Sequence, residues 1–233
     1  MLKASNEKKL VLFDIDGTLI RKGRAHRKAF IRAFKEVVNV KLKSNDFGNR
    51  YQGFTDTGII YDLMKRHNIT KKKGTVKKIM AVMVREFESS DLSGMMLIDG
   101  VADALKELSK HDNIIIGLVT GNLESIAYGK LKHFNIREYF LLGGFGHISD
   151  VRSKLIIDAI GQTKKRFGNI AKSNVFVVGD TPRDILAAKE AGVKVIAVAT
   201  GHVSSRELRS HNPDHLLEDL KNTKKLLEVI QHG

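Results

Sequence analysis

The stretch Leu-Val-Leu-Phe-Asp-Ile-Asp-Gly-Thr-Leu at residues 10–19 indicates the fold of this chain. Its four apolar residues followed by a glycine turn are typical of a buried strand that ends sharply. Side chains alternate along a strand, so Asp14 and Asp16 leave the strand end on the same side. Two carboxylates about 4 Å apart repel each other by about 4 kcal/mol at an effective dielectric constant near 20. An ordinary surface turn explains one aspartate and a glycine but not this pair, which indicates a bound cation or a shared proton.

Two more polar motifs follow apolar runs later in the chain. Thr120, Gly121 and Asn122 come after the apolar run at 114–119, and Gly-Asp-Thr-Pro-Arg-Asp at 179–184 follows the run at 175–178. Ligands bind at the carboxyl ends of strands in a parallel sheet. The three motifs therefore predict a single site.

Hydrophobic periodicity predicts an α/β core with a helical insertion. Helices are expected over 26–38, around 59–64 and over 76–87, with no convincing strand between them. Strands and helices then alternate, which predicts a Rossmann-like, doubly wound parallel sheet. The remaining elements are expected as helices at 101–110, 123–134, 153–167 and 182–191, an apolar piece at 139–142, strands at 193–198 and 215–217, and a C-terminal helix. We predict a core of residues 1–19 and 95–233 and an all-α cap of residues 20–94.

Charge is concentrated in the predicted cap. The 233-residue chain has 40 lysine and arginine residues against 26 acidic ones, a net charge of +14. Residues 20–90 alone hold 18 basic and 6 acidic side chains, and this shift marks a compositional boundary. The absence of cysteine excludes disulfides and thiolate metal sites. No apolar stretch approaches the ~18 residues of a membrane span, so we expect a cytoplasmic protein without a membrane partner.

The three motifs, in this order over about residues 9–220, resemble motifs I, II and IV of the haloacid dehalogenase superfamily of phosphohydrolases. The chain is similar to the phosphoglycolate phosphatase-like members, which carry an α-helical cap between motifs I and II. The resemblance implies that Asp14 is a nucleophile that forms an aspartyl-phosphate. It also implies that Asp16 is the general acid and base, and that Thr120 binds a phosphoryl oxygen together with the turn at Gly121 and Asn122.

The resemblance further implies a Mg²⁺ cofactor. Its ligands would be Asp14, the backbone carbonyl of Asp16, Asp180 and Asp184, an oxygen-only set that suits this ion. Asp184 has an alternative interpretation as an ordinary residue of a first helical turn, favoured there by the helix dipole.

Motif III departs from the common pattern of the family, in which a lysine precedes Pro-x-Pro. The segment at 149–155 reads Ser-Asp-Val-Arg-Ser-Lys-Leu. Arg152 is the favoured counterpart of the lysine, because its planar fork suits phosphate. Lys154, two residues later, is the alternative, and the sequence leaves the choice open.

A segment of the predicted cap resembles the family's specificity loop. It reads Gly-Phe-Thr-Asp at 53–56, and Thr55 and Asp56 are its candidate substrate-binding residues. Either residue could instead cap the next helix, and the two roles are compatible. His26, six residues after the predicted start of the cap, is expected to be structural or solvated more readily than to bind a ligand.

The resemblance implies a Mg²⁺-dependent phosphatase that hydrolyses a small phosphorylated metabolite, acting as a monomer or homodimer. A phosphosugar mutase of the β-phosphoglucomutase type shares these motifs and is an alternative. The basic cap and its aromatic residues indicate a further alternative, a nucleic-acid-directed phosphatase or binding protein. A dehalogenase is disfavoured, because that branch lacks an aspartate at the position of Asp16. The cap charge either solvates the outer helix faces or draws in an anionic ester.

Overall fold

A six-stranded parallel sheet forms the centre of the molecule, in a computed structural model that describes residues 7–21, 23–70 and 72–233. In spatial order its strands are β5 (Gly143–Phe145), β4 (Ile114–Thr120), β1 (Lys9–Phe13), β6 (Val175–Gly179), β7 (Lys194–Val198) and β8 (His215–Leu217). All neighbouring strands pair in parallel. The chain runs outward from β1 in both directions, so the strand order reverses beside β1. Ligands bind at such a reversal, outside the carboxyl ends of the strands.

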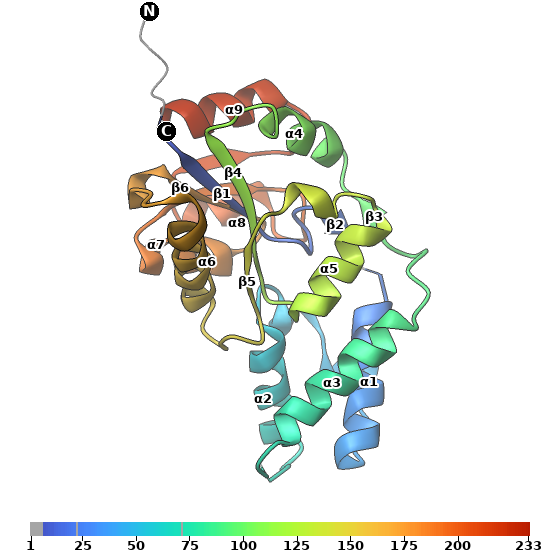
Figure 1. The fold of residues 1–233 in the computed structure, drawn as a ribbon. Coiled ribbons are helices and arrows are strands. Elements are labelled where there is room, and N and C mark those ends of the chain that lie inside the picture. The colour runs from blue at the N-terminus through green and yellow to red at the C-terminus, as the bar shows by residue number, and fades with distance from the viewer. Residues whose placement is uncertain (1–6, 22, 71) are drawn as a thin grey trace, which may run out of the picture.

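Helices cover both faces of the sheet (Figure 1). The helices on one face are α6 (Arg152–Phe167), α7 (Pro182–Ala191) and α8 (Ser205–Ser210), and those on the other are α4 (Val101–Leu108), α5 (Glu124–His133) and α9 (Thr223–His232). Alternate residues of β1 enter the two cores: Leu10 and Leu12 pack under α6 and α7, and Val11 and Phe13 pack under α4 and α5. Since both faces are buried, the strand reads as a continuous apolar run.

The insertion between β1 and β4 is helical and lies beyond the lower edge of the sheet in Figure 1. It contains α1 (Ala25–Val38), α2 (Asp56–Arg66) and α3 (Thr75–Glu88), with α1 packed against α3. Where the insertion joins the core, β2 (Ile20–Arg21) and β3 (Met96–Leu97) pair in antiparallel fashion, which periodicity did not predict. Among the described residues there are also four short 3-10 helices, η1 (Ser44–Asp46), η2 (Asn49–Tyr51), η3 (Arg137–Tyr139) and η4 (Lys172–Asn174).

The predicted α/β fold with a helical insertion is confirmed. The limits of 20–94 for the cap and of 1–19 and 95–233 for the core stay predictions, and "cap" is used below for residues 20–94. In the described part of the chain, no helix is long and apolar enough to cross a membrane.

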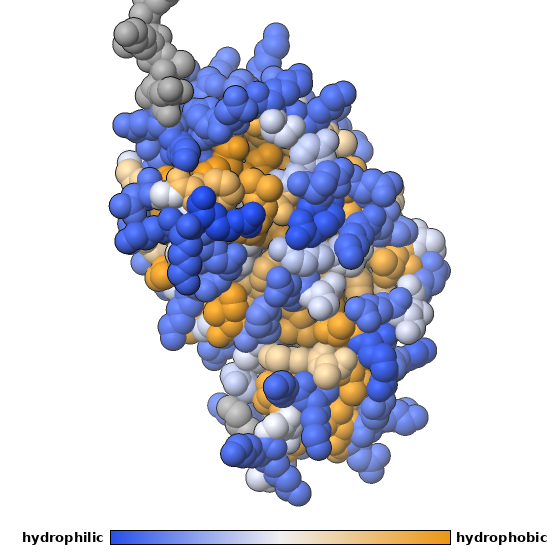
Figure 2. Space-filling view, viewed as in Figure 1, coloured by the Kyte–Doolittle hydropathy of each residue, from blue (hydrophilic) through white to orange (hydrophobic). Residues whose placement is uncertain are grey.

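The basic side chains of the cap lie on its surface. Figure 2 shows hydrophilic side chains along the lower margin and the sides of the cap, around an apolar strip. All lysine and arginine residues of the cap that the structure describes are exposed, among them Arg21, Arg24, Arg27, Lys28, Lys72, Lys73, Lys77 and Lys78. Lys22 and Lys71, which are among the 18 basic residues of 20–90, lie outside the described residues.

Candidate active site

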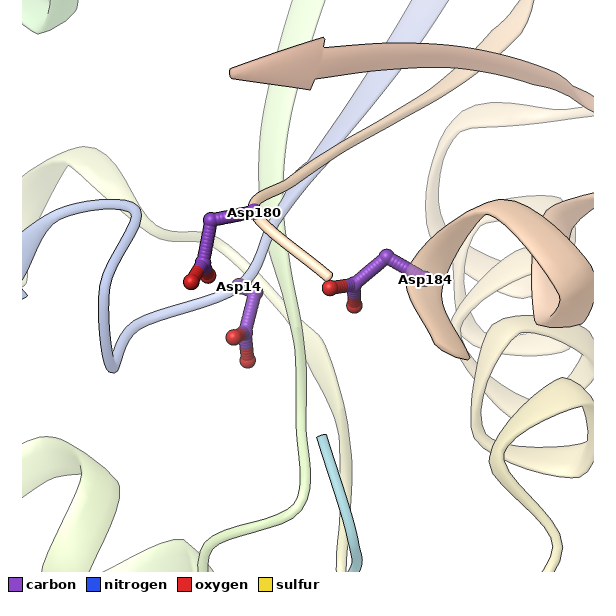
Figure 3. Close-up of side chains that lie close together, drawn as sticks. All are labelled: Asp14, Asp180 and Asp184. Carbon is purple, nitrogen blue, oxygen red and sulfur yellow. The ribbon is translucent and has the colours of Figure 1, made fainter. Parts of the chain in front are cut away.

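Three buried carboxylates converge at the carboxyl ends of β1 and β6 (Figure 3). Asp14 follows β1, Asp180 follows β6, and Asp184 lies in the first turn of α7. Their exposed fractions are 5%, 4% and 0%, and one oxygen from each lies within 4.8 Å of the others. The structure thus brings together three of the side chains that the motifs predicted to share one site.

Asp184 also begins its helix, so both interpretations of this residue describe its position. Its Oδ2 accepts hydrogen bonds from the backbone N–H of Thr181 at 3.0 Å and from Thr181 Oγ1 at 2.7 Å. The backbone N–H of Asp184 donates in return to Thr181 Oγ1 at 3.4 Å. This bond and the bond from Thr181 N form a capping box, with Pro182 at the first helical position. The start of α7 therefore holds Oδ2 of this carboxylate, and Oδ1 lies 2.6 Å from Arg152 Nη2.

Arg152 is the cation that lies against this cluster. Its Nη2 is 2.9 Å from Asp14 Oδ1 and 2.6 Å from Asp184 Oδ1, and the side chain is buried at the start of α6. Lys154 is exposed on the same helix. Of the two candidates for the motif III cation, the structure brings only Arg152 to the carboxylates.

The cluster holds more negative charge than Arg152 can balance. Burial raises the pKa of Asp14 to about 6, against the lowering effect of Arg152. Burial likewise raises the pKa of Asp180, and the charges of Asp14 and Asp184 raise it further. Three buried carboxylates beside one guanidinium form an oxygen-only donor set, which fits a hard divalent cation.

Asp16 turns away from the cluster toward α5. Lys130 Nζ lies 2.8 and 2.6 Å from its two oxygens, and Asn122 Nδ2 donates to its Oδ2 at 2.9 Å. The same amide group donates to Thr120 Oγ1 at 2.7 Å. Thr120 and Asn122, predicted to bind phosphate, therefore lie beside Asp16, and the Asp16 side chain is not part of the carboxylate cluster.

The cap loop (residues 53–56) is docked on the core. Asp56 N donates to Gly121 O at 2.7 Å, and a Cβ on Gly121 would lie 2.1 Å from Phe54 O. Only glycine permits this approach. Thr55 Oγ1 accepts from Gly58 N at 3.0 Å as the N-cap of α2. The loop thus both reaches the core and starts a helix, as the two compatible interpretations predicted.

Several polar residues around the site were not predicted from the sequence. Lys130 contacts Asp16, Thr18 Oγ1 donates to Asp180 Oδ1 at 3.0 Å, and the Arg183 guanidinium lies 3.8 Å from the centre of the Phe54 ring. The burial of Lys130 could have been predicted from its position in the helix. This lysine lies three and four residues after Ala127 and Ile126, on the stripe that α5 buries, whereas most lysines on helices lie outside such a stripe.

The comparisons with known proteins agree with this site. The family model "Haloacid dehalogenase-like hydrolase" matches residues 11–198. A phosphoglycolate phosphatase of Photorhabdus laumondii is 28% identical over 220 residues, covering 91% of this chain and 89% of the relative. A pyrophosphatase, PpaX, of Oceanobacillus iheyensis is 25% identical over 213 residues, covering 91% and 93%.

Solved structures support the fold. CbbY from Rhodobacter sphaeroides, determined in complex with phosphate, is 19% identical and superimposes with a TM-score of 0.73 over 92% of this chain and 96% of that one. The matches with the family model and the named phosphatases confirm the enzyme class expected from the motifs. The chain therefore belongs to the haloacid dehalogenase-like hydrolase family.

Proposed function

We propose that this chain is a Mg²⁺-dependent phosphatase that hydrolyses a small phosphorylated metabolite through an aspartyl-phosphate. The observation that carries the proposal is the position of Asp14. It lies at the carboxyl end of β1, in a buried cluster with Asp180 and Asp184, and pairs with Arg152 at 2.9 Å. The relatives named phosphoglycolate phosphatase and pyrophosphatase act on small phosphate compounds, which supports this substrate class.

The first step is attack of an Asp14 carboxylate oxygen on the phosphorus. The new Asp14–phosphorus bond forms as the bond to the ester oxygen breaks, and Asp16 supplies the proton that the leaving oxygen takes up. Arg152 faces the transferred phosphoryl group with its guanidinium fork. The hydroxyl of Thr120 donates to a phosphoryl oxygen, because its lone pairs already accept from Asn122.

The second step releases phosphate from the enzyme. Asp16, now ionised, takes a proton from water, and the oxygen of that water attacks phosphorus. The Asp14–phosphorus bond breaks, which returns Asp14 to its carboxylate form and frees inorganic phosphate. Mg²⁺, held by Asp14, Asp180, Asp184 and the Asp16 carbonyl, would neutralise the charge of the phosphoryl group and the carboxylates.

A panel of phosphate compounds tests the proposal. Phosphoglycolate, pyrophosphate, nucleoside monophosphates and hexose phosphates are incubated with the enzyme in Mg²⁺ or in EDTA, and released phosphate is measured. We expect release from at least one compound, dependent on Mg²⁺ and abolished by Asp14→Asn, while exposed Asp99→Asn retains it. Turnover by Asp14→Asn, or an isomerised sugar phosphate that keeps its phosphate, would contradict the proposal.

A further inference from the structure

Asp16 is held by a lysine that is itself fully buried. Lys130 is 0% exposed, and its ammonium lies 2.8 and 2.6 Å from the two Asp16 oxygens and 2.7 Å from Asn122 Oδ1. Lysine is almost never fully buried unless it is paired. Asn122 completes the arrangement by donating to Asp16 Oδ2 at 2.9 Å. Two core side chains therefore define where the Asp16 carboxylate lies.

The same ammonium reaches the cap. Lys130 Nζ is 3.4 Å from His26 Nδ1, and His26 Nε2 is 3.1 Å from Asp56 Oδ2. An ammonium can only donate, so Nδ1 accepts and the ring proton lies on Nε2, toward Asp56. Asp56 Oδ2 also accepts from the core at Leu123 N, at 2.8 Å. A continuous series of polar contacts thus connects the cap loop with Asp16.

The histidine in this series has little freedom to rotate. Its ring packs against Phe30 at a centroid distance of 5.4 Å and edge-on against Phe87 at 6.2 Å. Phe30 belongs to α1 and Phe87 to α3, the two packed cap helices. A shift of the cap relative to the core would therefore carry His26 away from Lys130.

We propose that Lys130 is a positioning residue for Asp16 and that it transmits docking of the cap to this carboxylate. The proposal rests on the proposed role of Asp16 in phosphate transfer. With the cap loop docked, Asp56 orients His26, and His26 constrains the Lys130 ammonium. The ammonium and Asn122 then fix the position of the Asp16 carboxylate. With the cap lifted, the His26 contact is lost, and Asp16 is held less firmly. Full alignment of Asp16 then coincides with closure over the substrate.

A purely structural role for Lys130 makes different predictions. If the ion pair only stabilises the fold, Lys130→Met should lower the melting temperature. Its effect on the rate should then be independent of Asp16, so that the losses of the two single variants multiply in the double variant. A positioning role makes the two substitutions non-additive in kcat, because Lys130 acts through Asp16. Misplacement of a catalytic group by about 1 Å can cost about 100-fold in rate.

The rate experiment compares Lys130→Met, Asp16→Asn and the double variant with a small alkyl phosphate. Lys130→Met should lower kcat about 10- to 100-fold and change KM less than about threefold. The double variant should be no slower than Asp16→Asn alone. Lys132→Met, an exposed lysine on the same helix, is the matched control and should keep the wild-type rate. Multiplying losses, or a Lys130→Met rate equal to that of the control, would overturn the proposal.

Transmission from the cap is tested by substitutions of His26. These variants keep the Asp16–Lys130 pair, so they test the proposal even if Lys130→Met fails to fold. Glutamine can accept from Lys130 and donate to Asp56, whereas alanine can do neither. His26→Ala should therefore lower kcat, and His26→Gln should retain most of it. Equal losses in the two variants would overturn the transmission through His26.

A spectroscopic measurement separates this proposal from the proposed function. Buried, paired ammonium protons exchange slowly with water, so the Lys130 Nζ signal should be observable in protein labelled with ¹⁵N-lysine. It should shift in Asp16→Asn and in His26→Ala and stay unchanged in Lys132→Met. Failure of the wild type to release phosphate from any compound refutes the proposed function, and the signal still decides the positioning role. A signal unchanged in the first two variants would overturn it.

Discussion

The buried carboxylates should make the metal-free protein less stable as the pH rises. Burial raises the pKa of Asp14 from an ordinary value of 3.8 to about 6, so the folded state holds this proton more tightly than the unfolded chain does. Stability falls with pH wherever the folded state binds more protons. The contribution of the protonated form is complete below about pH 4 and is lost as the pH rises through about 6.

The size of the effect follows from the shift. About two pH units at about 1.36 kcal/mol each give a loss of about 3 kcal/mol from Asp14. We expect Asp14→Asn to remove this loss, because the amide does not ionise. Urea unfolding in EDTA from pH 4 to pH 8 measures this difference. Across this range the free energy of unfolding of the variant, relative to that of the wild type, should rise by about 3 kcal/mol.

Two comparisons check the reasoning. Asp99→Asn, whose side chain is 80% exposed, should follow the wild-type curve. Adding Mg²⁺ at pH 8 should stabilise the wild type, by about 2.7 kcal/mol at a hundred times the dissociation constant, and should have little effect on Asp180→Asn. Parallel pH curves for the wild type and Asp14→Asn would refute the idea that the cluster is electrostatically unfavourable without a cation.

Three other variants test the chemistry and the cap. Asp16→Asn should slow turnover ~10²–10⁴-fold with alkyl phosphates and less with nitrophenyl phosphate, whose leaving group needs little protonation; equal losses would argue for another role. Gly121→Ala should raise KM, because its Cβ would lie 2.1 Å from Phe54 O and displace the cap loop; an unchanged KM would contradict this. If the cap attracts substrate, kcat/KM should fall with ionic strength, and charge reversal at Arg24 and Arg27 should flatten that dependence; indifference to salt would assign the charge to solvation.

The sequence predicted the long elements well because their apolar patterns are strong, and it failed where the pattern is weak. The apolar piece at 139–142 is assigned to no element by the sequence, and the strand β5 is the next segment, Gly143–Phe145. Glycine weakens a strand and gives no apolar pattern. A Cβ on Gly144 would lie 2.0 Å from Leu155 O, so the close packing of α6 requires glycine at this position. The helix α8 was not predicted, because it is polar and buries only Leu208, which leaves no apolar periodicity.

Within the site, predictability depended on backbone topology. Asp14 and Asp180 follow adjacent parallel strands, so their convergence could be inferred from the sequence. The choice between Arg152 and Lys154 depends on the exact rotation of α6 at its first turn, which periodicity does not define. The pattern of α5 indicates that Lys130 is buried, but its partner Asp16 lies 114 residues away in the sequence, and local patterns cannot reveal that contact.

The position of β1 at the centre of the sheet has a consequence for synthesis of the chain. Residues 9–13 pair with 114–118 on one side, and residues 10–13 pair with 175–178 on the other. The strand β1 is therefore completed by strands made much later. At about 5–20 residues per second, roughly 8 to 30 seconds separate translation of β1 from translation of β6. During that interval the apolar run Leu-Val-Leu-Phe has no native partner on that side. Such non-local parallel pairing folds slowly and exposes strand edges, so the nascent chain is most prone to aggregation before β6 leaves the ribosome.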